Sequence, residues 1–222
     1  TKEDTDYSVT AEGKNADGSD IEVAGTVEVK DNVVTAAPKE GYEITDVKVQ
    51  KNKTDWKPDG AENDWWKSDL DASGAFKYEE FEDSTLDADY VFTITFAKKQ
   101  FTFTYTISQN GKLILNSGAD NDKVEITAEN ENKDGKENVP YTNDEYKIKA
   151  AVTDTDYHLT SFKVDNEEQI TADKIQNGLD ECEYTFEKGI TSSHSIEVTA
   201  VIDTCKVTIE KDGKEADAKR IF

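Results

Sequence analysis

Three tryptophans lie close together in one acidic segment of the chain. Trp56, Trp65 and Trp66 are the only tryptophans among the 222 residues, and carboxylate and amide side chains surround them. Indole faces stack on sugar rings or on partner side chains, and nearby carboxylates and amides supply hydrogen bonds. The segment therefore predicts a ligand-binding site, for which we select Trp56, Trp65, Trp66, Asp55 and Asp64. The alternative is that the indoles cover one end of a small core.

A second segment has the ligand spacing of an EF-hand calcium loop. Between Asp69 and Glu80, oxygen-bearing side chains occupy positions 1, 3, 5 and 12, and Gly74 stands at position 6, where such a loop turns sharply. Lys77 at position 9 is unfavourable, and no flanking helices are evident. Such spacing arises easily in a chain with 49 acidic residues. We predict no metal ligands and no cofactor, and keep a structural Ca²⁺ in this loop as the alternative.

The cysteines and histidines are weaker candidates for chemistry. Cys182 and Cys205 occupy apolar strand positions. If the strands around Cys182 and after Ile196 form a hairpin, a disulfide can form, and two buried thiols are the alternative. We interpret His158 and His194 as surface residues, because neither has a companion at metal-ligand spacing. Nothing in the sequence orients Cys182 and His194 as a catalytic dyad, so we predict no catalytic residues and a protein that is not an enzyme.

The elements that must position these residues occur twice along the chain. The residues from Gly41 to Val49 recur, with changes, from Asp156 to Val164. The alternation before each copy also matches, with Val33, Thr35 and Ala37 corresponding to Ile148, Ala150 and Val152. A repeat of roughly 100 residues indicates an array of domain-sized modules. The tryptophan segment has a shorter counterpart without tryptophan at 165–181, which suggests a site grafted onto a shared scaffold.

Short alternating runs with frequent turn signals predict antiparallel β structure. The run from Phe101 to Ile107 is the most regular, with apolar residues on one face and threonine on the other. Only Trp65–Leu70 and Asp173–Leu179 are candidates for short helices. We predict all-β or β-rich tandem modules, β-grasp-like or sandwich-like, with few short helices. Their expected bounds are 1–98 for module 1 with a Trp-rich insert at 50–75, 99–203 for module 2, and 204–222 for the start of a truncated third module.

The order of motifs resembles the internalin-B-type B-repeat modules of Gram-positive surface proteins. The residues that carry the resemblance are Gly41-Tyr42-Glu43-Ile44, Val47-Lys48-Val49, Tyr78-Glu79-Glu80-Phe81 and Thr93-Ile94-Thr95-Phe96-Ala97, with Tyr157-His158-Leu159, Phe162-Lys163-Val164-Asp165, Tyr184-Thr185-Phe186 and Ser195-Ile196-Glu197-Val198-Thr199-Ala200 in the second copy. The modules here are longer than a typical repeat of that family, and Asp156 replaces the turn glycine. The resemblance implies a β-rich module displayed on a cell wall as a stalk or adhesive element, with no catalytic residues to transfer.

The composition narrows the class of protein. A net charge of -23 repels phosphate backbones and anionic lipid, which argues against nucleic-acid and membrane-surface binding. The absence of methionine and the abrupt polar start predict a fragment of a longer protein. We predict a monomeric, extracellular binding or adhesion module of a bacterial cell-surface protein that recognises a host or extracellular protein or glycan, such as an immunoglobulin or matrix protein, through its loops. The alternatives are a structural stalk and an accessory carbohydrate-binding region of a secreted enzyme.

Overall fold

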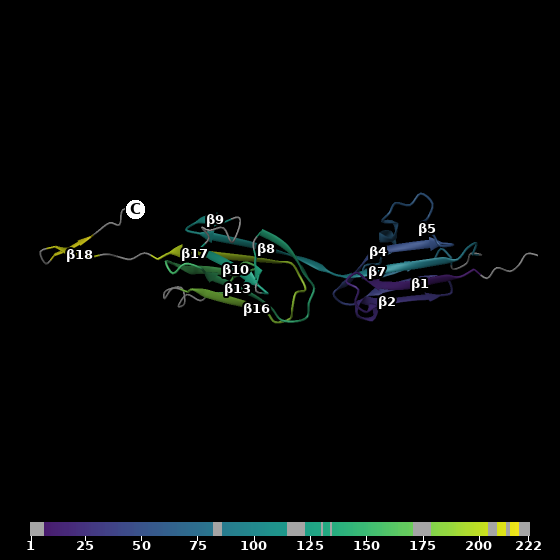
Figure 1. Ribbon diagram of the computed structural model, residues 1–222, viewed down its shortest axis with the longest axis horizontal. Coiled ribbons are helices and arrows are strands. Elements are labelled where there is room, and N and C mark those ends of the chain that lie inside the picture. Colours follow the sequence, from purple (N-terminus) through teal and green to yellow (C-terminus); the bar gives the residue numbers. More distant parts are fainter. Residues whose placement is uncertain are drawn as a thin grey trace, which may run out of the picture. The chain divides into compact units, whose positions relative to one another are not determined.

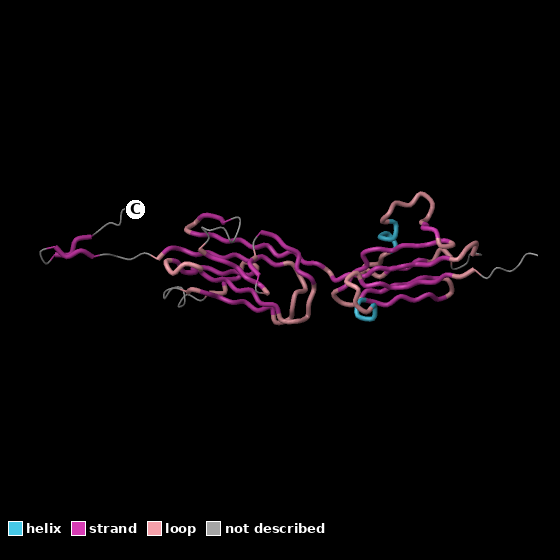
Figure 2. Tube along the Cα trace, viewed as in Figure 1, coloured by secondary structure: helices cyan, strands magenta, loops and turns pink. Residues whose placement is uncertain are grey.

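The computed structural model of the chain describes residues 7–81, 86–114, 123–129, 131–133, 135–170, 179–203, 208–211 and 214–217. The chain folds into two compact units (Figure 1): unit 1 holds Thr1–Gln100 with Pro140–Thr142, and unit 2 holds Phe101–Val139 with Asn143–Phe222. Figure 2 shows that strands make up most of each unit, which confirms the predicted all-β class. Within the described residues, no helix is long and apolar enough to cross a bilayer.

Unit 1 consists of two sheets. The first has the strand order β1-β7-β4-β5, in which β1 runs parallel to β7 and the other neighbours are antiparallel. The second has the order β2-β3-β6 and is antiparallel. The elements are β1 (Val9–Asn15), α1 (Ile21–Ala24), β2 (Gly25–Lys30), β3 (Val33–Pro38), β4 (Tyr42–Lys51), β5 (Thr54–Trp56), η1 (Trp65–Asp69), β6 (Phe76–Tyr78) and β7 (Tyr90–Lys98).

Unit 2 also consists of two sheets, and its C-terminal part includes a separate hairpin, β18–β19. The sheets have the orders β12-β8-β17-β14-β15, with β9 also on β8, and β11-β10-β13-β16. Strand β8 runs parallel to β17, as β1 does to β7. The strands are β8 (Gln100–Gln109), β9 (Lys112–Ile114), β10 (Val124–Ala128), β11 (Glu131–Asn132), β12 (Gly135–Pro140), β13 (Tyr146–Val152), β14 (Tyr157–Val164), β15 (Glu167–Glu168), β16 (Glu181–Phe186), β17 (His194–Ile202), β18 (Thr208–Lys211) and β19 (Lys214–Asp217).

The core of each unit lies between its two sheets. In unit 1, Ile44, Phe92 and Phe96 from the first sheet pack in one buried cluster with Val34 and Phe76 from the second. In unit 2, one buried cluster likewise takes side chains from both sheets. Alternation along the strands places apolar residues on the inner faces and polar residues outside. This two-layer arrangement corresponds to the sandwich-like alternative and not to the grasp-like one.

The repeated stretch found in the sequence forms the same strand in both units, with the same irregularity. Strand β4 slips in register against β7 between Ile44 and Asp46, and β14 slips against β17 between Leu159 and Ser161. The residue at each slip is a threonine whose hydroxyl donates to a carbonyl oxygen of the partner strand, at 3.3 Å in both units. Bulges of this kind twist a strand and are structural features in their own right. The repeat therefore extends from strand order to local backbone detail.

Several sequence predictions need correction. The alternating residues Val33, Thr35 and Ala37 are not the inward ones of β3. Val34 and Ala36 are buried instead, because successive side chains of a strand point to opposite faces. The one-turn helix α1, which begins at Ile21, is not among the short helices predicted from the sequence; Asp20 caps it by accepting the Glu22 N–H. The predicted helix at Trp65–Leu70 is present as η1, whereas residues 173–178 lie outside the described part of the chain.

Candidate functional site

The tryptophans of unit 1 are positioned by one hairpin and one short helix. Strand β4 returns as β5 through Asn52 and Lys53, whose φ values of 49° and 67° give the backbone twist of a tight hairpin turn. This turn places Trp56 opposite Val49. Trp65 and Trp66 are the first two residues of η1. An isolated bridge between Leu70 and Phe76 returns the loop to the second sheet.

All three indoles are anchored to the core, but to different extents. Trp66 is 2% exposed and belongs to the buried cluster, so it covers the core and does not reach a ligand. Trp65 is half-buried and packs edge-on against Phe76 and Tyr78, with ring centroids 6.2 and 5.5 Å apart. Trp56 is also half-buried and packs edge-on against Tyr90 at 5.2 Å. The structure therefore leaves two indole surfaces accessible to solvent.

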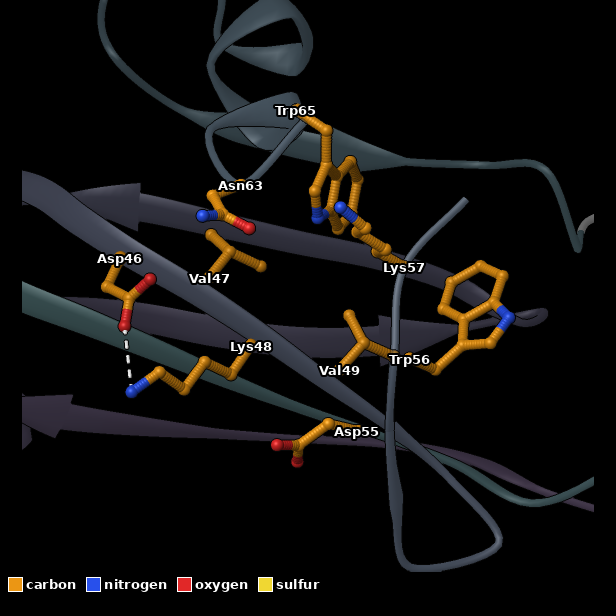
Figure 3. Close-up of a pocket in the computed structure, with 9 residues that line it drawn as sticks. All are labelled: Asp46, Val47, Lys48, Val49, Asp55, Trp56, Lys57, Asn63 and Trp65. Atoms are coloured by element: carbon orange, nitrogen blue, oxygen red, sulfur yellow. Dashed lines mark ion pairs between the residues drawn. The ribbon is translucent and has the colours of Figure 1, made fainter. Parts of the chain in front are cut away.

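These two surfaces line an open groove of about 360 Å³ beside β4 and β5. Figure 3 shows the indole of Trp65 next to Lys57 and the indole of Trp56 pointing away from Trp65, so the rings line different parts of the groove. The lining residues are Asp46, Val47, Lys48, Val49, Asp55, Trp56, Lys57, Asn63 and Trp65. Apolar ring surface with a few amide and charged groups is the usual composition of a ligand site.

The polar groups of the groove are partly engaged with each other. Asp46 and Lys48 form an ion pair at 3.3 Å, shown dashed in Figure 3. Asp55 accepts a hydrogen bond from Gln50 at 3.3 Å on the exposed edge. Both contacts are exposed and cost little to break. A ligand with hydrogen-bonding groups can therefore replace them at small free-energy cost.

The selected residue Asp64 lies beside this groove instead of inside it. Its carboxylate pairs with Lys67 at 2.7 Å, and it lines a neighbouring shallow hollow with Lys57, Glu62 and Asn63. The structure thus brings together Trp56, Trp65 and Asp55 and leaves Trp66 and Asp64 outside the groove. The residues selected from the sequence did not include Asn63 and Lys57, although both lie in the same segment as the tryptophans and both line the groove.

The candidate calcium loop is held by its own hydrogen bonds. Asp71 Oδ1 accepts from the Ser73 N–H, the Ser73 hydroxyl and the Ala75 N–H at 2.8, 2.6 and 3.0 Å, which lowers the pKa of Asp71. Glu80 accepts from the Tyr78 hydroxyl at 2.6 Å. Burial and then the charge of Glu80 raise the pKa of Asp69. Among the described residues, no cluster of three or more His, Cys, Asp or Glu could hold a metal ion.

The cysteine and histidine predictions have separate outcomes. The hairpin on which the disulfide prediction was conditional does not form, because β16 and β17 belong to different sheets. Cys182 packs partly exposed against the unit 2 core, while Cys205 lies outside the described residues, so the disulfide stays a prediction. The interpretation of His158 and His194 as surface residues is wrong, because their side chains are only 20% and 14% exposed. Each bonds an aspartate, Asp203 and Asp165 respectively. Their partners stand 45 and 29 residues away, and no local spacing in the sequence revealed them.

Comparisons with known proteins give little further information. No known protein family matches the chain, and no curated protein matches it in sequence. Among solved structures, the chain is similar to the major pilin protein (T3.2) from Streptococcus pyogenes serotype GAS13637, with 13% identity over 81% of this chain and 69% of that chain. The TM-score is 0.22. A score this low carries no argument about fold or function, so the resemblance to B-repeat modules stays a prediction.

Proposed function

We propose that this chain is a binding module of a bacterial cell-surface protein and that unit 1 recognises an extracellular glycan or protein through the groove beside Trp56 and Trp65. The observation that carries the proposal is the pair of half-buried indoles in a groove with exposed polar groups. Burying the remaining ring surface against a ligand is favourable, and tryptophan is enriched among residues that dominate binding. The extracellular location and the surface display rest on the resemblance of the repeat motifs.

The comparison between the units supports a specific role for this groove. The two units share the strands beneath it, but unit 2 carries the short strand β15 at the place of β5 and has no tryptophan. A feature required by the scaffold itself would be expected in both copies. The indoles of Trp56 and Trp65 are therefore candidates for a function that unit 2 does not share.

The test is a glycan array and a serum-protein pull-down, followed by affinity measurements from tryptophan fluorescence. We expect Trp56→Ala and Trp65→Ala each to raise the Kd of any captured ligand at least tenfold, which corresponds to about 1.4 kcal/mol. Trp66→Phe is the matched control, because its ring is buried away from the groove and its replacement should leave the Kd unchanged. A captured ligand that binds the two groove variants as tightly as wild type contradicts the proposal.

A second candidate function is a load-bearing spacer, and the pairing of first and last strands favours it. In unit 1, β1 pairs in parallel with β7 over seven residues, and in unit 2, β8 pairs in parallel with β17 over seven residues. The chain enters each sandwich along the first of these strands and leaves along the second. Tension on the chain pulls two such strands in opposite directions, so their hydrogen bonds are loaded together instead of one after another.

Single-molecule force spectroscopy tests the spacer. We expect both units to unfold at higher force when pulled through the chain ends than unit 1 does when pulled through handles at Thr26 and Ala37. These two exposed residues face each other on β2 and β3, so force applied there separates one residue pair at a time. Equal unfolding forces in the two geometries would remove the mechanical argument while leaving the groove proposal untouched.

A further inference from the structure

Three side chains of unit 2 form a hydrogen-bonded chain where β17 begins. The carboxylate Oδ2 of Asp165 lies 2.6 Å from Nδ1 of His194, and Nε2 of His194 lies 3.2 Å from the hydroxyl oxygen of Ser192. Asp165 stands in the turn between β14 and β15, and His194 is the first residue of β17. A nucleophile and a base within hydrogen-bond reach, with the base oriented by a third group, is the arrangement that activates a hydroxyl.

Asp165, which carries the orienting carboxylate, is held in place by two hydrogen bonds to the backbone of Ser195. The Asp165 N–H donates to the carbonyl oxygen of Ser195 at 2.8 Å, and Asp165 Oδ1 accepts the Ser195 N–H at 2.9 Å. Asp165 also has a φ of 52°, as the first residue of the hairpin turn requires. These constraints leave Oδ2 directed at His194. Support of this kind keeps an orienting carboxylate in place without further cost at the moment of reaction.

The ring of His194, the base, is also held in place. The His194 ring packs against Phe103 and Phe186, with ring centroids 5.2 and 4.5 Å apart, and its side chain is 14% exposed. A carboxylate only accepts hydrogen bonds, so Nδ1 of His194 carries the proton shared with Asp165. In the neutral ring, Nε2 therefore holds the lone pair that faces the Ser192 hydroxyl. Ser192 itself is exposed.

Space for a small ester lies beside these groups. A shallow hollow of about 470 Å³ includes Ser192 and His194 in its lining, together with Tyr184, Phe186 and Lys188. In unit 1, the position equivalent to His194 holds Tyr90, since each of them pairs with the corresponding residue of the parallel first strand. Tyr90 donates its hydroxyl hydrogen to Asp87 at 2.8 Å. In both units the ring at this position, Tyr90 or His194, fills one end of the core. In unit 2 the ring also has a basic nitrogen that faces a hydroxyl.

We propose that Ser192, His194 and Asp165 form a nucleophilic site that accepts acyl groups from small carboxylic esters. The Ser192 oxygen forms a bond to the ester carbonyl carbon while its proton passes to Nε2 of His194. The carbon–oxygen bond to the alcohol breaks, and the alcohol leaves with that proton. Water then attacks the acyl-serine, its proton passes through His194 to the serine oxygen, and a carboxylic acid is released. This activity is separate from binding at the tryptophan groove and departs from the sequence-based expectation of a non-enzymatic chain.

The first test follows p-nitrophenyl acetate hydrolysis and maps acetylated residues by mass spectrometry. Wild type should release p-nitrophenolate above the buffer rate and carry acetyl on Ser192. Ser192→Ala and His194→Tyr should lower the enzymatic rate about 100-fold, with His194→Tyr installing the ring that unit 1 uses. Ser193→Ala and His158→Ala are the controls and should retain the rate, because Ser193 accepts from the Thr102 N–H and His158 bonds Asp203.

The second test uses a fluorophosphonate, which phosphonylates activated serines, on the wild-type chain. We expect one adduct, on Ser192, and its loss in His194→Tyr with circular dichroism unchanged. Acetyl groups found only on lysine or tyrosine, or hydrolysis that persists in Ser192→Ala, would overturn the proposal. A wild-type chain that neither hydrolyses the ester nor takes the phosphonate at Ser192 would overturn it as well, and would assign the three groups to packing alone.

Discussion

Strands β4 and β7 of unit 1 correspond to β14 and β17 of unit 2. The large buried phenylalanines of these strands, however, belong to β7 in unit 1 and to β14 in unit 2. Strand β7 contributes Phe96 where β17 contributes Ala200, and β14 contributes Phe162 where β4 contributes Val47. All four residues are buried. Cores tolerate such exchanges when total volume and the inward pattern are kept. The two units therefore share a backbone plan and not a set of side-chain contacts.

A second exchange of volume accompanies the first. In unit 1, strand β2 pairs with β3 and begins with Gly25. A Cβ added to Gly25 would lie 2.5 Å from the Phe96 ring of the other sheet. The equivalent position of unit 2 holds Val124, in the same core as Ala200. In unit 1 the large Phe96 ring on one sheet is thus accompanied by a glycine on the other sheet. In unit 2 the small Ala200 is accompanied by the branched Val124. The difference shows how the repeat could diverge in sequence while its strand order stayed the same.

The largest expected effect comes from emptying one core at a time. Phe96→Ala in unit 1 and Phe162→Ala in unit 2 each remove a fully buried ring, and each should lower the free energy of unfolding of its own unit by about 3–5 kcal/mol. Tryptophan fluorescence reports on unit 1 alone, because all three tryptophans lie there, whereas circular dichroism reports on both units. A fluorescence transition shifted equally by both variants would show that the units do not unfold independently.

The next effect tests the exchange of volume directly. Gly25→Ala places a methyl group against Phe96 and 2.8 Å from the Ala37 carbonyl oxygen, so we expect a loss of about 1–3 kcal/mol in the urea unfolding of unit 1. In a Phe96→Leu background the same change should cost less, because part of the clash is gone. The single variants and the double variant form a cycle that measures this coupling. If the free-energy changes of the two single variants add up strictly in the double variant, Gly25 does not make room for the Phe96 ring.

The sequence indicated the shared scaffold well because strand alternation and turn residues are local signals. The repeat from Gly41 to Val49 and the β-rich class both followed from patterns of a few residues. The inward face of β3 could not be predicted in this way, because Val33 and Val34 are both apolar and only the packing against the other sheet decides which one points inward. Local patterns therefore sufficed for strands and failed where the opposite sheet makes the choice.

The candidate sites were less predictable, for a related reason. The tryptophan cluster was visible because its members are close in sequence, but burial of Trp66 depends on where η1 meets the core. The contact between Asp165 and His194 joins a turn to a strand 29 residues further on, and only the pairing of β14 with β17 brings them together. A single sequence carries no local signal of such a contact.

A smaller effect concerns a carboxylate that unit 2 uses beside its bulge. Glu168 accepts from the Ser161 hydroxyl at 2.6 Å and from the N–H groups of Phe162 and Ile170 at 2.9 and 3.1 Å. Partial burial raises the pKa of Glu168, but these hydrogen bonds outweigh it and lower the pKa overall. A lowered folded-state pKa gives stability that is present above the unfolded-state pKa and is lost as the pH falls through the folded-state value.

We therefore expect Glu168→Gln to destabilise unit 2 by about 1 kcal/mol at pH 7, a modest value because the side chain is exposed. The difference from wild type should shrink as the pH falls below about 4, the range in which free glutamate becomes protonated. Circular dichroism melts at several pH values measure it. The neighbouring exposed Glu167→Gln is the control and should change little. A Glu168→Gln deficit that stays constant down to acid pH would contradict the assignment of a charged acceptor.

The smallest effect should be the same in both units, because it concerns the feature that they share most closely. Thr45 and Thr160 stand at equivalent bulges and donate to the carbonyl oxygens of Thr95 and Thr199, both at 3.3 Å. Replacing either hydroxyl with a methyl group, in Thr45→Val or Thr160→Val, should cost about 0.5 kcal/mol, since one long hydrogen bond is lost and the shape is kept. Urea unfolding followed by fluorescence for unit 1 and by circular dichroism for unit 2 measures the two losses. If only one unit responds, the threonine is retained in the other for a different reason, and the bulge alone does not explain why both copies carry it.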